Sequence, residues 1–118
     1  MDIERTGFAC RVEEVHSGDD LMVFVDLGVD GLWKRTRVRL HGVDAPNAFR
    51  ASPSTEAGKV RDEVKRLTAG KCYLHLVREG GGGWIAELDA ETPSGETINI
   101  NSLLQDKGYT YPAGKQKT

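Results

Sequence analysis

The chain has no long apolar run. Its 118 residues are 38% hydrophobic, and no stretch reaches the roughly 20 apolar residues that a membrane-spanning helix needs. Residues 1–5 lack the basic start and the apolar middle of a secretory signal peptide. These absences exclude a helical membrane protein and, if the sequence is that of the whole protein, predict a cytoplasmic chain with no membrane partner.

Cysteine and histidine are scarce. The only two cysteines are Cys10 and Cys72, so the chain is not a disulfide-rich scaffold, and no cysteine pair with nearby histidines offers a zinc site. The thiols are expected to be free and buried, with a disulfide between them as the alternative. Among the three histidines, His16 precedes the first acidic segment, and His41 lies three residues before Asp44, where it could act on a bound phosphate or water.

The charge balance excludes a strongly basic protein. A net charge of −2 argues against strong nonspecific binding to nucleic acid. Basic side chains nevertheless gather in residues 33–41, which alternate as a strand would. One face would hold Arg35, Arg37, Arg39 and His41, and the other would place Thr36, Val38 and Leu40 in a core. A solvated surface and a binding face are both open interpretations of the basic side.

Turn residues divide the chain into short strand-like and helical segments. A helix is expected to be capped at Ser52, with Pro53 at its first position, and to stop at Gly70. Asn101 is expected to cap a second, short helix that ends at Gly108. Strands are expected at 8–15, 21–25, 33–40, 72–77, 84–90 and 96–100.

About five strands with one helix between the third and the fourth predict a mainly β (α+β) fold. The expected architecture is a five-stranded Greek-key barrel of the oligonucleotide-binding type with a short C-terminal helix, and a half-open roll is the alternative. The glycines at 80–83 are expected to form a flexible link or a turn. A phosphate cradle is the weaker alternative, because the lysine and hydroxyl residue of a phosphate-binding loop are missing. No repeat or linker divides the chain, so we expect a single domain over 1–118 with a frayed tail at 112–118.

Two short segments carry the candidate chemistry. Residues 17–20 read Ser-Gly-Asp-Asp after the first strand, and residues 39–46 read Arg-Leu-His-Gly-Val-Asp-Ala-Pro at the end of the third. Each segment places a carboxylate, Asp19 or Asp44, beside a turn-forming residue, and Arg39 precedes the second carboxylate. Two hard oxygen donors and a guanidinium suit a divalent cation and a phosphate group.

These two segments resemble the staphylococcal nuclease (thermonuclease) family. That family pairs a Gly-Asp segment after its first strand with an Arg-x-x-x-Val-Asp-x-Pro segment after its third. Residues 100–108 are also similar to the family's last barrel helix, so the resemblance covers roughly residues 9–110. It implies an oligonucleotide-binding-type barrel and calcium-dependent hydrolysis of phosphodiester bonds in DNA and RNA. The family's additional C-terminal helix is not expected here.

The resemblance also implies a set of site residues. Asp19, Asp44 and the backbone carbonyl of Ala45 would hold the cation, Ca²⁺ or Mg²⁺, and Arg39 would contact the scissile phosphate. The family usually has threonine where this chain has Ala45. Because the ligand is a backbone oxygen, this change leaves the proposed metal site intact.

Two departures from the family pattern weaken the expected catalysis. Asn47 stands where the family has the glutamate that assists the attacking water, and loss of a general base lowers rates by about 10²–10⁴. Trp84 stands at the place of the family's second arginine, and loss of one such charge lowers rates by about 10²–10³. We therefore expect a degenerate member that binds nucleic acid with weak or no hydrolysis.

The expected partner is single-stranded or flexible DNA or RNA. Arg35 and Arg37 would extend the contact surface beyond Arg39, and Tyr109 and Tyr111 would offer stacking surfaces for unpaired bases. The acidic overall charge leaves a protein partner open as well.

Two other functions stay open from the sequence alone. One is an active metal-dependent phosphodiesterase with a rearranged site, in which Asp20 or Glu56 supplies the missing carboxylate and Arg37 or Arg50 the missing cation. The other is a catalytically inert module that binds another protein, with the two aspartates only holding turns.

Overall fold

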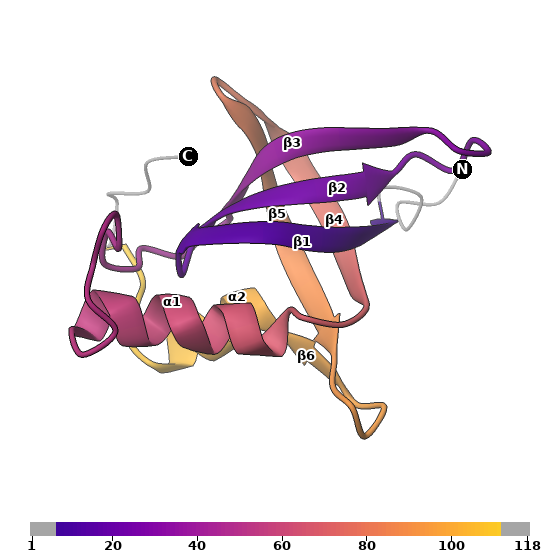
Figure 1. Cartoon of the computed structure of the whole chain (residues 1–118). Coiled ribbons are helices and arrows are strands. Elements are labelled where there is room, and N and C mark those ends of the chain that lie inside the picture. Colours follow the sequence, from indigo (N-terminus) through magenta and orange to yellow (C-terminus); the bar gives the residue numbers. More distant parts are fainter. Residues whose placement is uncertain (1–6, 112–118) are drawn as a thin grey trace.

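Five strands curl into a closed barrel in the computed structural model, which describes residues 7–111 (Figure 1). Neighbouring strands run antiparallel in the order β3-β2-β1-β4-β5, and parallel pairing of β3 with β5 closes the barrel. This arrangement confirms the predicted mainly β barrel of the oligonucleotide-binding type. The barrel strands are β1 (Gly7–Ser17), β2 (Asp20–Asp26), β3 (Trp33–Leu40), β4 (Cys72–Gly80) and β5 (Gly83–Glu91).

Three shorter elements complete the fold. Helix α1 (Glu56–Leu67) lies between β3 and β4 in the sequence and runs alongside β1 in Figure 1. Strand β6 (Thr97–Asn99) pairs with the end of β5 and leads directly into helix α2 (Ile100–Asp106). The predicted order of strands and helices is therefore confirmed, and no helix within residues 7–111 is long and apolar enough to cross a membrane.

The core follows from the alternation of side chains along the strands. On β3, Thr36, Val38 and Leu40 are buried, while Arg35, Arg37 and Arg39 are exposed on the outer face, as the sequence predicts. The two helices cover the barrel with the apolar residues that recur on one face. The core side chains include Leu21, Val23, Val25, Val60, Val64, Leu74, Leu88, Ile100 and Leu104.

The boundaries of α1 differ from the prediction. Thr55, and not Ser52, is the N-cap, because its hydroxyl accepts a hydrogen bond from the backbone N–H of Gly58 at 3.1 Å. Residues 52–55 form a turn that folds against the first helical turn, so a Cβ at Gly58 would lie 2.0 Å from the carbonyl oxygen of Ser52. The helix also ends at Leu67, three residues before the predicted stop.

The predicted cap of α2 was wrong as well. Asn99 caps this helix and accepts a hydrogen bond from the backbone N–H of Ser102 at 2.8 Å. Asn101 lies in the first turn, buried, and bonds to β5 and to the segment after β3. The predicted frayed tail at 112–118 lies outside the described residues.

Closure of the barrel depends on a close approach at Gly83. A Cβ at this position would lie 2.2 Å from the carbonyl oxygen of Arg37, so only glycine lets β5 begin beside β3. The glycine run is thus a β4–β5 hairpin turn whose last residue is sterically required. This closure places the outer face of β3 beside the hairpin.

Candidate nucleic-acid interface

The β1–β2 turn and the segment after β3 meet at one end of the barrel. The backbone N–H of Leu40 donates to the carbonyl oxygen of Asp19 at 2.9 Å. The backbone N–H of Ala45 donates to the Asp19 carboxylate at 3.3 Å. The structure therefore brings Asp19 together with the segment that carries Arg39 and Asp44.

Packing around the turn fixes this meeting point. Gly18 is buried, and a Cβ there would lie 2.6 Å from a methyl group of Val60 on α1 and 3.2 Å from the Cβ of Ala45. The backbone N–H of Asp44 donates to the carbonyl oxygen of Tyr109 at 3.0 Å. The turn, α1 and the segment after α2 thus fix the backbone that carries the two aspartates.

The carboxylates of Asp19, Asp20 and Asp44 lie near enough to influence one another electrostatically. Burial raises the pKa of Asp19, and the neighbouring carboxylates of Asp20 and Asp44 raise it further, while the N–H of Ala45 acts in the opposite direction. Burial also raises the pKa of Tyr111, with a further contribution from Asp19 and Asp44. A bound cation would relieve the charge that is unfavourable at Asp19.

The predicted donors are of the type that a divalent cation binds when it is shared with a ligand. Asp19 and Asp44 supply two carboxylates, and Ala45 adds a backbone carbonyl at the same place in the chain. Within the described part of the chain, no three His, Cys, Asp or Glu side chains form a metal-binding group. Such a set suits Mg²⁺ or Ca²⁺ that takes its remaining oxygens from water and phosphate, since Mg²⁺ sites often have only one or two carboxylates.

The arginines of the outer face of β3 have different partners. Arg35 donates to Glu13 at 2.6 Å, and Arg37 makes a bidentate contact with Asp20, one bond of which measures 2.9 Å. Arg39 makes no ion pair with any residue in the 7–111 range. Of the three arginines on the outer face of β3, Arg39 is therefore the one whose guanidinium can bind an anion without displacing a carboxylate.

The two replaced positions supply no ionisable group to the site. The Asn47 side-chain oxygen accepts a hydrogen bond from the backbone N–H of Phe49 at 2.9 Å and closes a local turn. Trp84 is only 9% exposed and belongs to the core, where its ring centroid lies 5.6 Å from that of Phe8. Its burial also means that the Trp84 ring is packed away from solvent.

The carboxylates and cations that could replace the missing glutamate and arginine already have other partners. Glu56 accepts a hydrogen bond from the Tyr109 hydroxyl at 2.7 Å, a contact that raises the pKa of this tyrosine. The carboxylate of Asp20 is held by Arg37. The guanidinium of Arg50 lies 5.1 Å from the ring centroid of Phe49. Asp20 and Arg37 nevertheless line one hollow with Asn47, and Arg37 lines another with Trp84, so this ion pair lies beside both replaced positions.

Sequence reasoning missed two features of this region. Phe49 is 73% exposed beside the site, a position that an apolar residue in a polar loop could have signalled. One imidazole nitrogen of His41, Nδ1, is buried without a hydrogen-bond partner in the described structure, and the backbone of this residue bonds to Ala86 and Asn101. The spacing of His41 from Asp44 gave no hint of this burial.

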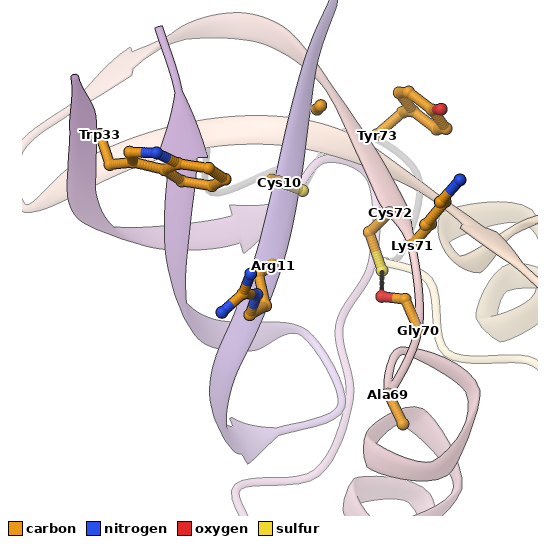
Figure 2. A pocket seen from close by; sticks show the side chains of 9 residues that line it. Cys10, Arg11, Trp33, Ala69, Gly70, Lys71, Cys72 and Tyr73 are labelled. Carbon is orange, nitrogen blue, oxygen red and sulfur yellow. Dashed lines mark hydrogen bonds between the residues drawn. The ribbon is translucent and has the colours of Figure 1, made fainter. Parts of the chain in front are cut away.

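A different hollow, of about 460 Å³, lies away from the two aspartates, where α1 ends and β4 begins (Figure 2). Trp33 and Tyr73 flank it, and the two free cysteines lie between them. Burial raises the pKa of Cys10 to about 12 and that of Cys72 to about 11. The predicted free, buried thiols are confirmed, and such protonated thiols are poor nucleophiles.

Comparisons with known proteins assign no family to this chain. No family model matches it, and a search of curated proteins returns no match. The resemblance to the staphylococcal nuclease family therefore stays a proposal that rests on two motifs and on their meeting in space.

Proposed function

We propose that the chain is a nuclease-like barrel that binds single-stranded or flexible DNA or RNA and hydrolyses it weakly or not at all. The observation that carries this proposal is the convergence of Asp19, Asp44 and Arg39 at one end of the barrel, where Arg39 has no ion-pair partner among residues 7–111. A phosphate of the strand would contact Arg39. The two aspartates with the Ala45 carbonyl would hold a Ca²⁺ or Mg²⁺ ion, which neutralises phosphate charge when bound.

The neighbouring arginines support a longer contact with the strand. Arg35 and Arg37 precede Arg39 on the same outer face of β3. Residues two apart on a strand are separated by about 6.6 Å. The ion pair of Arg35 with Glu13 lies at the surface, where such a pair contributes only about 0–1 kcal/mol. Arg35 can therefore exchange its carboxylate for a phosphate at little cost, whereas Arg37 is held more firmly by its bidentate pair with Asp20. Binding should weaken steeply with salt.

The absence of strong catalysis follows from the two replaced positions. An amide at Asn47 cannot take a proton from water at neutral pH, and its oxygen already accepts a backbone hydrogen bond. The indole of Trp84 is buried in the core and carries no charge. Each loss lowers the rate by about 10²-fold or more, and the two losses need not multiply.

Binding is tested by the anisotropy of a short fluorescent single strand over a salt series. Arg39→Gln should weaken binding by about tenfold or more, since a charge-assisted hydrogen bond contributes about 1.5–3 kcal/mol. The slope of log K against log salt should fall by about 0.7. Arg66→Gln removes the same charge from the exposed last turn of α1 and serves as the matched control.

Equal effects of Arg39→Gln and Arg66→Gln would refute the assigned site. Wild-type protein that fails to bind even at low salt would refute nucleic-acid binding altogether and favour the protein-interaction alternative.

Hydrolysis is tested separately with denatured DNA, Ca²⁺ or Mg²⁺, and a chelator. We expect little cleavage above the background. Rapid, chelator-sensitive cleavage that Asp19→Asn abolishes would replace our proposal with an active phosphodiesterase. Cleavage that survives Asp19→Asn would come from a contaminating enzyme.

A further inference from the structure

Phe49 is displayed to solvent on a rigid segment. Its side chain is 73% exposed, whereas Ala48 beside it is 1% exposed and is anchored by Ser17, whose hydroxyl oxygen accepts a hydrogen bond from the Ala48 N–H at 2.9 Å. The N–H of Phe49 donates to the side chain of Asn47. The guanidinium of Arg61 donates to the carbonyl oxygens of Ala48 and Ala51 at 3.3 and 2.9 Å. The fold therefore holds this aromatic ring outward.

The backbone and the next side chain add to this display. Arg50 has a φ of 57°, in the left-handed region that residues other than glycine rarely adopt. This conformation places its guanidinium 5.1 Å from the ring centroid of Phe49, within the range of a cation–π contact. One side of the ring is thus covered by a cation.

The ring also lines a hollow beside the candidate phosphate site. The hollow has a volume of about 450 Å³, and its other lining side chains are polar or charged. Asp20 and Arg37 form its border toward Asp19, and Asn47 follows the Asp44 segment. The complete lining is His16, Ser17, Asp20, Arg37, Asn47 and Phe49.

We propose that this hollow is a stacking site for an unpaired nucleobase, an inference that rests on the proposed function. The ring of Phe49 supplies the π face, and stacking of this kind tolerates any base. Oδ1 of Asn47 is already bonded, but its amide nitrogen has no hydrogen-bond partner in residues 7–111 and can donate to a base edge. His16, whose Nε2 lies 3.6 Å from Glu14, also lines the hollow. A phosphate at Arg39 would place the adjoining nucleotide next to this hollow.

The polar rim favours a base over an apolar partner. Among the described residues, Phe49 is the only large apolar side chain that lines the hollow, so a hydrophobic segment of a protein would desolvate Arg37, Asp20 and His16 without compensation. A nucleobase offers both a stacking face and hydrogen-bonding edges. Its phosphates would add charge complementarity to Arg37 and Arg50.

The test compares two fluorescent single strands of equal length, one with bases and one abasic. Phe49→Ala should weaken binding of the normal strand by about 5- to 150-fold and leave binding of the abasic strand unchanged. Phe49→Trp should bind the normal strand about as tightly as wild type, because it keeps an aromatic ring. Arg39→Gln should weaken binding of both strands, because it acts on phosphate.

Trp33→Ala is the matched control. Trp33 is 45% exposed, and the guanidinium of Arg11 lies 5.9 Å from its ring centroid. It lies at the other end of β3 from Arg39. This variant should leave binding of both strands close to wild type. Circular dichroism spectra of the variants verify that the fold is kept.

Three outcomes would overturn the inference. If Phe49→Ala changes neither strand, or weakens both equally, no base stacks on this ring. If Trp33→Ala weakens the normal strand as much as Phe49→Ala does, the effect is not specific to the hollow. If wild-type protein binds neither strand at low salt, the proposed function fails and the stacking site fails with it.

Discussion

Asn101 joins three parts of the fold through one buried side chain. It is 2% exposed, and its side-chain oxygen accepts a hydrogen bond from the backbone N–H of Leu88 at 2.9 Å. Its amide nitrogen donates to the carbonyl oxygens of His41 at 2.9 Å and Ala86 at 3.2 Å. Replacement by alanine removes all of these bonds while α2 keeps a residue that favours helix.

The expected loss of stability follows from the groups left behind. The carbonyl oxygen of Ala86 still accepts a bond from the backbone N–H of His41 at 2.9 Å, so it stays paired. The N–H of Leu88 and the carbonyl of His41 lose the Asn101 side chain as their partner. An orphaned buried group costs about 1–3 kcal/mol and the part-buried carbonyl of His41 costs less, so Asn101→Ala should destabilise the fold by about 1–4 kcal/mol. Water that enters the gap would bring the loss toward the lower value.

Urea unfolding followed by tryptophan fluorescence measures this loss. Ser102→Ala changes the neighbouring exposed residue of α2 and should shift the free energy of unfolding by less than about 0.5 kcal/mol. Asn101→Asp keeps an acceptor for Leu88 but directs a charged oxygen toward two carbonyls. It should therefore be at least as destabilising as Asn101→Ala at neutral pH and should recover on acidification.

The reasoning would be refuted if Asn101→Ala lowered the free energy of unfolding by less than about 1 kcal/mol, the contribution of a single ordinary hydrogen bond. Equal effects of Asn101→Ala and Ser102→Ala would refute it as well.

Three further predictions concern the turn, the thiols and the buried carboxylate. Gly18→Ala should destabilise the fold by about 1–3 kcal/mol in urea unfolding, because its Cβ would lie 2.6 Å from an α1 side chain, whereas Gly70→Ala has room and should be near neutral. The thiols of Cys10 and Cys72, with pKa values near 12 and 11, should resist a thiol reagent at mildly alkaline pH until denaturant is added. Rapid labelling of the folded chain would contradict the burial of these thiols. The free energy of unfolding should fall above pH 9, because the unfolded chain releases these thiol protons at lower pH than the folded chain does. Because burial raises the pKa of Asp19, ionisation is harder in the folded state, so Asp19→Asn should be more stable than wild type at neutral pH without metal. That advantage should vanish below the ordinary aspartate pKa, and thermal unfolding at both pH values measures it.

Local pattern was sufficient for the strands and for the composition of the core. The alternation in residues 33–40 predicted which side chains of β3 are buried, and the structure confirms it. A period of two residues has only two faces, so a strand with polar and apolar sides has one favourable orientation. The same logic predicted a barrel with one helix inserted between its third and fourth strands.

Helix ends were beyond local pattern. Ser52 and Asn101 both looked like caps, yet Thr55 and Asn99 perform this role. Several residues near each helix end can accept a backbone hydrogen bond, and tertiary packing selects among them. At Asn101 the selection was made by β5 and by His41, which offered a buried side chain better partners than its own helix.

The amino-acid order by itself determined the barrel strands, the outward row of arginines and the presence of two acidic turns. Only the folded chain decided that these turns meet and that Phe49 points into solvent. It also decided that Glu13 and Asp20 bind Arg35 and Arg37, while Arg39 has no ion pair within the described part of the chain. The reason is physical. Periodicity acts between residues that are near in sequence, whereas ion pairs and exposure depend on side chains that closure of the barrel brings together from distant segments.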